Sequence, residues 1–289
     1  MKQITGYQGF SLAEKTGGGA LLLAFSLGLI APSLAILPLS LFLLACLGAP
    51  FLPRSSFFLP VISSAAPGTQ GIALTFDDGP FPASTPLLLE LLARHSLPAT
   101  FFVTGRNAAA HPELIQAIVA HQQTIGNHSF RHDNLLMLRT TRTLHKDIRT
   151  TQDILATLGI RPLLFRPPVG ITNPRLGPVL ARLGLQAVTF SCRINDRGNR
   201  NIEHLAARVL RHLRPGQILL LHDNPPRNKH HSDLWLRELD SLFSCLRRTH
   251  RVLPLADLIN TPVMVPVDNQ PGPAPHPRST LAPFSTQPH

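Results

Sequence analysis

The sequence predicts an α/β fold, in which parallel strands alternate with helices and form a barrel, preceded by a membrane segment. Two patterns lead to this prediction. Between Gly71 and Ile259, short apolar runs of β type alternate with segments whose apolar residues repeat at helical spacing. Ahead of this region, no charged residue occurs between Lys15 and Arg54. The chain has 289 residues, which is enough for one such domain with extensions at both ends.

The uncharged stretch near the N-terminus predicts a membrane segment at residues 19–62, after an N-terminal flank at residues 1–18. It is longer than the apolar part of a cleaved signal peptide, which has about 7 to 15 residues. Because about 20 residues span a bilayer, the stretch could form one tilted helix or two helices broken at Pro32 and Pro38. A buried helix pair of a soluble protein is the third alternative.

The side of the membrane on which the main domain lies depends on the number of spans. Lys2 and Lys15 favour a cytoplasmic N-terminus. One span would then place the main domain outside, whereas a hairpin of two spans would keep it inside. We therefore expect a protein anchored in a bacterial inner membrane, with the side of its main domain left open.

Six apolar runs are predicted to be buried strands of the main domain, which occupies residues 71–260 after a linker at residues 63–70. They lie at residues 72–76, 99–103, 123–125, 163–165, 186–190 and 218–221. Helices are expected to begin near Pro86 and Pro112, because proline is favoured at the first helical position. Residues 261–289 contain eight prolines without periodicity and are expected to form a disordered tail.

The net charge of +11 comes without the pattern of a nucleic-acid-binding protein. Basic residues are spread along the chain and form no block or run interleaved with aromatic residues. We therefore expect no nucleic-acid partner, and the basic surface suits anionic lipid head groups instead. The three cysteines lack the spacing of a metal site or a disulfide framework, and the sequence indicates no protein partner.

Two adjacent carboxylates, Asp77 and Asp78, close the first predicted strand in the segment TFDDGP. In a parallel barrel, chemistry gathers on the loops that follow the carboxyl ends of the strands. One carboxylate can hold a metal ion there while the other faces the substrate. Taken alone, however, such a string is more often a simple turn.

The segment NHSFRH, which follows the third predicted strand, contains His128 and His132. Histidines four residues apart lie on the same side of a helical turn, a spacing typical of zinc ligands. Together with Asp78 they would supply three protein ligands and leave coordination positions for water. A hydrolytic metal needs this arrangement.

Two later strands also end in candidate residues. Arg166 begins the segment RPPVG, which by itself indicates a rigid proline turn with a solvated arginine. His222 follows a very apolar strand in the segment LLLHD. Because the unperturbed pKa of histidine lies close to neutrality, His222 is a natural candidate for a general acid.

In this order and at these strand ends, the four segments closely resemble the polysaccharide deacetylase family, the NodB-homology group of carbohydrate esterase family four. The resemblance covers about residues 71–259, and the pair TFDDGP and HSFRH is its most specific part. It implies a distorted, incomplete (β/α) barrel related to the TIM barrel. It also implies hydrolysis of N-acetyl, or sometimes N-formyl, groups on sugars.

The resemblance further implies a role for each matching residue. The roles are general base for Asp77, metal ligand for Asp78, His128 and His132, orientation of the base for Arg166, and general acid for His222. The backbone N–H of Val169 would stabilise the oxyanion. Histidine and carboxylate ligands favour Zn²⁺ as the divalent metal, with Co²⁺, Ni²⁺ or Mn²⁺ as alternatives.

The sequence also departs from the family pattern. Val169 stands where the family commonly has an aromatic residue, and the family's Asp-x-x-Asp-Trp segment reads RINDR at residues 193–197. Asp196 remains available to orient or tune His222, but the first carboxylate and the tryptophan of the segment are absent. The remaining candidates for the wall of a substrate pocket are Phe81, Phe130, Pro168 and Trp235.

The sequence therefore predicts a metal-dependent deacetylase that acts on N-acetylated amino-sugars of a cell-envelope polysaccharide or glycan. Because aromatic residues are few and a membrane segment is expected, a deformylase or deacylase of a lipid-linked sugar is the alternative enzyme. An inactive glycan-binding or membrane scaffold protein is the alternative of another class. The presence of a base, three metal ligands and an acid argues against the inactive protein.

Overall fold

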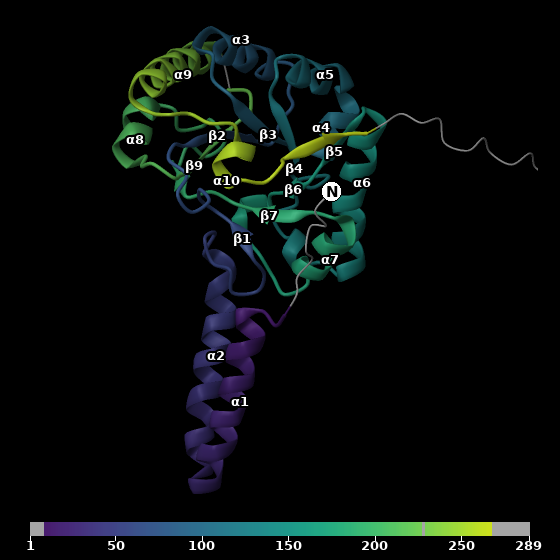
Figure 1. The fold of residues 1–289 in the computed structure, drawn as a ribbon, viewed down its shortest axis with the longest axis vertical. Coiled ribbons are helices and arrows are strands. Elements are labelled where there is room, and N and C mark those ends of the chain that lie inside the picture. Colours follow the sequence, from purple (N-terminus) through teal and green to yellow (C-terminus); the bar gives the residue numbers. More distant parts are fainter. Residues whose placement is uncertain (1–8, 227–228, 268–289) are drawn as a thin grey trace, which may run out of the picture.

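The computed structural model describes residues 9–226 and 229–267, in which helices wrap a curled sheet and a helical hairpin projects from one end (Figure 1). The strands are β1 Val61–Ile62, β2 Ala73–Asp77, β3 Ala99–Val103, β4 Thr124–Asn127, β5 Ile160–Pro162, β6 Leu164–Phe165, β7 Gln186–Val188, β8 Cys192–Arg193, β9 Ile218–His222 and β10 Met264–Pro266. The helices are α1 Leu12–Ile30, α2 Ile36–Gly48, α3 Thr85–His95, α4 Gly105–Ala110, α5 Pro112–Ala120, α6 Thr141–Thr157, α7 Leu176–Leu183, α8 Leu205–His212, α9 Lys229–Thr249 and α10 Leu255–Ile259. Four 3₁₀ turns are η1 Pro32–Ala35, η2 Ala49–Phe51, η3 Leu136–Leu138 and η4 Pro168–Gly170.

Eight strands form one sheet in the order β1-β7-β6-β4-β3-β2-β9-β8, and every neighbouring pair is parallel. Strands β2 and β3 are buried along their whole lengths, as expected for parallel strands that are covered on both faces. Among the described residues β1 and β8 are the two edges of the sheet, so the barrel is incomplete. The predicted incomplete (β/α) barrel is confirmed.

All six predicted strands are present, with boundaries that differ by no more than a few residues. The structure corrects two of the predicted segment boundaries. Residues 61–62, placed in the membrane segment, form β1 and pair with β7. Residues 264–266, placed in the disordered tail, form β10 and pair with β5 in an antiparallel ladder. Runs of two or three residues are too short for a pattern of alternating polarity to identify, and residues 268–289 of the predicted tail lie outside the described residues.

Trp235 lies in helix α9 and is 1% exposed, so its assignment to a pocket wall is wrong. It shares one face of the helix with four other apolar residues of the core, Leu239, Leu242, Phe243 and Leu246. This spacing is the apolar stripe of an amphipathic helix. The stripe packs against the core beneath α3 and α8, and the only tryptophan of the chain is therefore a packing residue.

Helices α1 and α2 form the projecting hairpin and lie side by side in Figure 1. A capping box starts α1, since Ser11 Oγ accepts a hydrogen bond from Glu14 N at 3.1 Å while Glu14 Oε2 accepts one from Ser11 N at 2.7 Å. Gly17 allows close packing of the two helices, because a Cβ there would lie 2.8 Å from the ring of Phe42. The two-helix alternative therefore describes the fold of this segment.

The outer surface of the hairpin is almost entirely apolar. The stretch Pro32–Phe51 is the one helix among the described residues that is long and apolar enough to cross a membrane, with a mean hydropathy of 2.2. Its large side chains are exposed, as are most of those of α1 after Lys15. A soluble core helix would bury these side chains, and residues 9–226 and 229–267 leave them exposed.

The base of the hairpin is continuous with the barrel. Ala13 N, in the first turn of α1, donates a hydrogen bond of 2.9 Å to Phe57 O. Phe57, Phe58 and Leu59 are buried in a cluster that joins α2 and η2 to helices α6 and α7. The hairpin is thus seated on the barrel by a shared apolar core.

Candidate active site

The candidate residues lie at the carboxyl ends of neighbouring strands. Asp77 ends β2 and is paired in register with His222, which ends β9. His128 follows the last residue of β4, and Arg166 follows the last residue of β6. Because all these strands are parallel, the four side chains start from the same edge of the sheet.

Arg166 is completely buried and forms an ion pair with Asp77. Its Nη1 donates to Asp77 Oδ1 at 2.7 Å and to Thr75 Oγ1 at 2.8 Å, and its Nη2 donates to Thr189 O at 3.0 Å. The guanidinium also lies 3.9 Å from the centre of the Phe102 ring. The solvated arginine expected from RPPVG alone is therefore not what the structure shows, and the side chain instead holds Asp77 in one orientation.

Asp78, His128 and His132 converge beside Asp77. Asp78 Oδ1 lies 3.5 Å from His128 Nε2 and 3.3 Å from His132 Nε2, and one ligand atom from each of the three residues lies within 4.8 Å of the others. Asp77 Oδ2, the oxygen not bound by Arg166, lies 3.7 Å from His128 Nε2. The free oxygen of Asp77 therefore faces the space between the three residues.

The three residues fit a tetrahedral metal ion. Ligand atoms about 2.1 Å from a tetrahedral zinc ion are about 3.4 Å from one another, close to both separations measured from Asp78 Oδ1. Asp78 Oδ1 is buried and, among the described residues, has no hydrogen bond of ordinary geometry, although buried carboxylate oxygens normally have a partner. A cation would supply this partner.

Local contacts orient the two imidazoles. His128 Nδ1 donates a hydrogen bond of 2.8 Å to Arg166 O, which leaves Nε2 directed at Asp78. Asn127 Oδ1 accepts from Ser129 N at 2.9 Å and shapes the turn that carries the histidines. His132 has a left-handed backbone with φ 52°, as does Asp78 with φ 80°. Residues in this uncommon region cluster at functional sites.

The charges within the cluster shift the pKa values of its members. Burial favours the neutral form of Asp78, but the close approach of His128 at 3.5 Å and the charges of the nearby histidines outweigh burial and lower the pKa of Asp78 to about 2. Burial and the charge of His128 lower the pKa of His132. Burial opposes the charged form of His128, yet Asp77 and Asp78 raise its pKa. A bound cation would displace this proton, since a metal-bound imidazole is neutral.

His222 is paired with Asp196. His222 Nδ1 donates to Asp196 Oδ2 at 2.8 Å, and Asp196 is 1% exposed. Burial lowers the pKa of His222, but the hydrogen bond and charge of Asp196, followed by the charges of Asp78 and Asp77, raise it above the ordinary value. The ring is therefore held in one orientation and keeps a proton to higher pH than a free histidine does.

Val169 lies in η4, three residues after Arg166, and is 37% exposed. Its backbone is left-handed, with φ 54° and ψ 9°. Such a conformation is a genuine outlier for a β-branched residue and costs about 1 to 3 kcal/mol. The turn is thus held in an unusual shape at the edge of the site.

The remaining pocket candidates have structural contacts that leave their predicted role open. Phe81 N donates to Thr85 Oγ1 at 2.7 Å at the start of α3. Phe130 packs against Gly105, where a Cβ would lie 2.8 Å from its ring, and Pro168 is buried. No described contact identifies any of the three as a sugar-binding surface.

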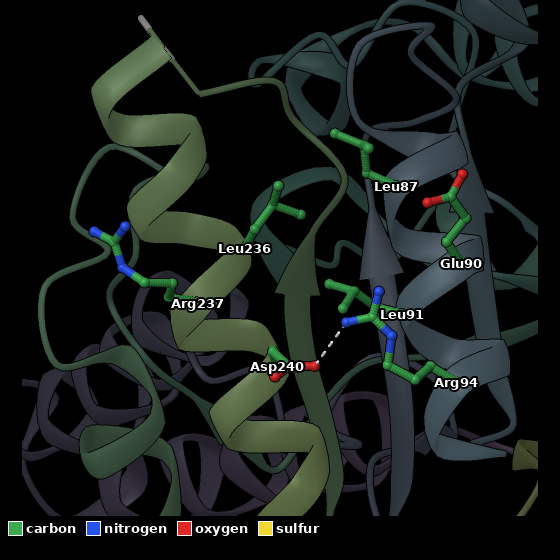
Figure 2. A pocket seen from close by; sticks show the side chains of 7 residues that line it. All are labelled: Leu87, Glu90, Leu91, Arg94, Leu236, Arg237 and Asp240. Carbon is green, nitrogen blue, oxygen red and sulfur yellow. Dashed lines mark hydrogen bonds and ion pairs between the residues drawn. The ribbon is translucent and has the colours of Figure 1, made fainter.

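A surface cavity of about 250 Å³ lies elsewhere, between α3 and α9. Figure 2 shows the ion pair of Arg94 with Asp240 across it, at 3.3 Å. Leu87, Leu91 and Leu236 contribute its apolar lining. None of the candidate site residues lines this cavity, so it adds nothing to the chemistry at the strand ends.

Several supporting residues were missed by sequence reasoning. Thr75 and Thr189 each accept a hydrogen bond from Arg166, and Thr75 also donates to Leu219 O at 2.7 Å. Asp223, next to His222, is buried, accepts a hydrogen bond of 2.6 Å from Thr85 Oγ1 and has a pKa raised to about 7, chiefly by burial. Thr75 and Asp223 stand inside the segments TFDDGP and LLLHD, so adjacency to the candidate residues was the available signal.

Comparison with known proteins identifies the family of the chain. The polysaccharide deacetylase family model matches residues 64–188. The chitooligosaccharide deacetylase of Bradyrhizobium sp. (strain ANU 289) is 35% identical over 201 residues, which are 66% of this chain and 91% of that protein.

Solved structures give the same result for the fold. The crystal structure of the Bc1960 peptidoglycan N-acetylglucosamine deacetylase has a TM-score of 0.63 at 27% identity and covers 70% of this chain and 94% of its own. The structure of peptidoglycan deacetylase PdaC from Bacillus subtilis has a TM-score of 0.58 at 30% identity. The match covers 67% of this chain and 91% of that chain. With the strand-end residues, the matching profile and these relatives in agreement, the chain belongs to the polysaccharide deacetylase family.

Proposed function

We propose that this chain is a metal-dependent amide hydrolase that removes N-acetyl groups from amino-sugar glycans. The observation that carries the proposal is the carboxylate of Asp77, which is fixed by Arg166 on one oxygen and faces Asp78, His128 and His132 with the other. Its relatives are named as chitooligosaccharide and peptidoglycan deacetylases, which supports an N-acetylated amino-sugar as substrate. An inactive scaffold would have no need for a paired base and a paired acid.

Asp78, His128 and His132 would hold the metal, and we propose Zn²⁺ because two imidazoles and one carboxylate are ligands that zinc prefers. When bound, the ion would act as a Lewis acid toward the amide carbonyl and lower the pKa of a water molecule. Co²⁺, Ni²⁺ and Mn²⁺ remain chemically compatible alternatives. The three-residue donor set leaves coordination positions for water and substrate.

Two different residues would carry out the two proton transfers of the reaction. Asp77 would accept the proton of the attacking water through Oδ2, because Oδ1 is occupied by Arg166. His222, kept protonated by Asp196, would donate a proton to the departing amine. The backbone N–H of Val169 would stabilise the oxyanion during the reaction.

The hairpin would anchor the enzyme in a membrane, with both of its ends on one side. Lys15 lies in the first turn of α1, close to Ala13, which donates a hydrogen bond to Phe57, and Arg54 follows η2, so the two charges that flank the uncharged stretch lie at the base of the hairpin. Basic residues at this end favour the cytoplasmic side. We therefore propose that the catalytic domain of a bacterial enzyme lies at the cytoplasmic face of the inner membrane.

Substitutions at Asp77 and His128 should separate the base from the metal ligands. Asp77→Asn should abolish acetate release while zinc content stays near that of the wild type, because Asp77 is not one of the three ligands. His128→Ala should lose both zinc and activity, because two protein ligands hold a catalytic ion poorly. Elemental analysis and an acetate-release assay measure the two properties. Wild-type activity in Asp77→Asn would remove Asp77 from the role of base.

Substitution of Asp196 should change the pH dependence of turnover. Asp196 raises the pKa of His222, so Asp196→Asn should lower that pKa. If protonated His222 is the general acid, the alkaline limb of the kcat profile should move to lower pH in the variant. The acid limb of the profile should keep its position. A full kcat profile against pH measures this shift. An alkaline limb at the wild-type position would show that His222 is not the titrating acid.

Protease accessibility should reveal the side on which the domain lies. With an epitope tag added at the C-terminus, the tag should resist protease in sealed right-side-out vesicles and be digested in inverted ones. A periplasmic reporter domain serves as the control for vesicle orientation. Digestion of the tag in right-side-out vesicles would place the domain outside and contradict the two-span hairpin.

A further inference from the structure

The end of the hairpin is attached directly to the active-site edge of the barrel. Pro53, two residues after η2, accepts a hydrogen bond of 2.6 Å through its carbonyl from Thr189 Oγ1, just beyond the end of β7. Pro53 also packs on the turn after β6, where a Cβ on Gly170 would lie 3.4 Å from Pro53 Cβ. The chain therefore leaves the hairpin between two of the strand-end turns.

These contacts connect the hairpin to the catalytic base by a short path. The hydroxyl of Thr189 donates a hydrogen bond to the carbonyl of Pro53, and the carbonyl of Thr189 accepts one from Arg166. Arg166 in turn donates a hydrogen bond to the carboxylate of Asp77. Arg54, the first charged residue after the apolar stretch, is exposed directly next to Pro53. If the hairpin crosses a membrane as proposed, Arg54 would lie at the level of the lipid head groups, and the contacts of Pro53 would hold the strand ends close to the bilayer surface.

Exposed apolar side chains lie at the end of the hairpin and in the segment that follows His132, and we call these residues the rim. The rim comprises Phe51 and Leu52 at the end of the hairpin and Leu135 and Leu138 around η3, which are exposed by 70%, 60%, 55% and 76%. The turn η3 begins four residues after His132.

Leu136 and Met137, the residues between the two exposed leucines, are buried in the cluster that contains Ala49 of the hairpin base. The η3 segment thus shares a buried cluster with the hairpin base, while its Leu135 and Leu138 are exposed. Isolated exposed leucines are ordinary, but two of them on a turn that shares a buried cluster with the base of an apolar hairpin suit contact with lipid.

The chain has few aromatic side chains that could bind a long glycan in water. Its single tryptophan lies on the buried face of α9, and its single tyrosine precedes the hairpin in the sequence. Aromatic faces that could stack on a series of sugar rings are therefore scarce. The observations favour recognition of one sugar that the membrane itself delivers.

We propose that the substrate is an N-acylated amino-sugar carried on a membrane lipid, which reaches the strand ends while its lipid chain stays in the bilayer beside the rim. This inference rests on the proposed function and adds the carrier to it. Anchoring both partners in one membrane confines their encounter to two dimensions and raises the effective concentration of substrate without any new polar contact. The exposed leucines would line the passage between the bilayer and the metal site.

The test compares a lipid-borne N-acetylated sugar with soluble N-acetylated glycans, using the full-length zinc-loaded enzyme in lipid nanodiscs. N-acetylglucosamine linked to polyprenyl diphosphate in the disc is compared with chito-oligosaccharides in solution, and released acetate gives kcat/KM for each. We expect the lipid-borne sugar to be preferred by at least roughly tenfold. The double variant Leu135→Ser with Leu138→Ser should lower this preference by a similar factor, while its melting temperature stays unchanged.

Val265→Ser is the matched control, because Val265 is an exposed apolar residue on β10, outside the rim, and should leave the preference intact. The lipid-carrier proposal would be wrong if the soluble glycan were hydrolysed equally well or better, or if the leucine variant did not change the preference. Either result would leave the proposed deacetylase function in place. Failure to release acetate from both substrates would instead refute the proposed function, and the inference with it.

Discussion

The buried ion pair between Arg166 and Asp77 is the interaction on which the arrangement of the site depends. Removing a guanidinium from water costs several kcal/mol, and here the cost is offset by the carboxylate of Asp77, two further acceptors and the ring of Phe102. The same residue also accepts, through its backbone carbonyl, the hydrogen bond that orients His128. One side chain and one carbonyl thus position the proposed base and a proposed metal ligand together.

The separation of roles between Asp77 and Asp78 follows from this constraint. Adjacent residues at a strand end point in different directions, and Asp78 departs further because its backbone is left-handed. Asp77 is bound by the arginine, whereas Asp78 keeps a buried oxygen with no ordinary hydrogen bond among the described residues. Asp78 could therefore hold a metal ion without competing for the oxygen of Asp77 that would accept the proton.

Sequence reasoning could reach most of the barrel and the residues of the site, because apolar runs mark the long strands and polar residues directly follow them. It could not find β1 or β10, since their two or three residues carry no period of their own and depend on pairing partners far along the chain. It assigned Trp235 to a pocket because the residue type was considered without the apolar stripe of α9. It also treated the membrane segment and the site as separate, since the link from Pro53 to Thr189 joins residues 136 positions apart.

The most direct test of the account is a double-mutant cycle of Arg166→Met and Asp77→Asn, read as kcat/KM from release of radiolabelled acetate, an assay able to follow residual rates. If Arg166 acts by holding Asp77, the arginine variant alone should lose at least about a hundredfold in rate, but should cost little once Asp77 has been replaced. The double variant would then be about as active as Asp77→Asn. Losses that multiply would show that the two residues act independently and would contradict the account.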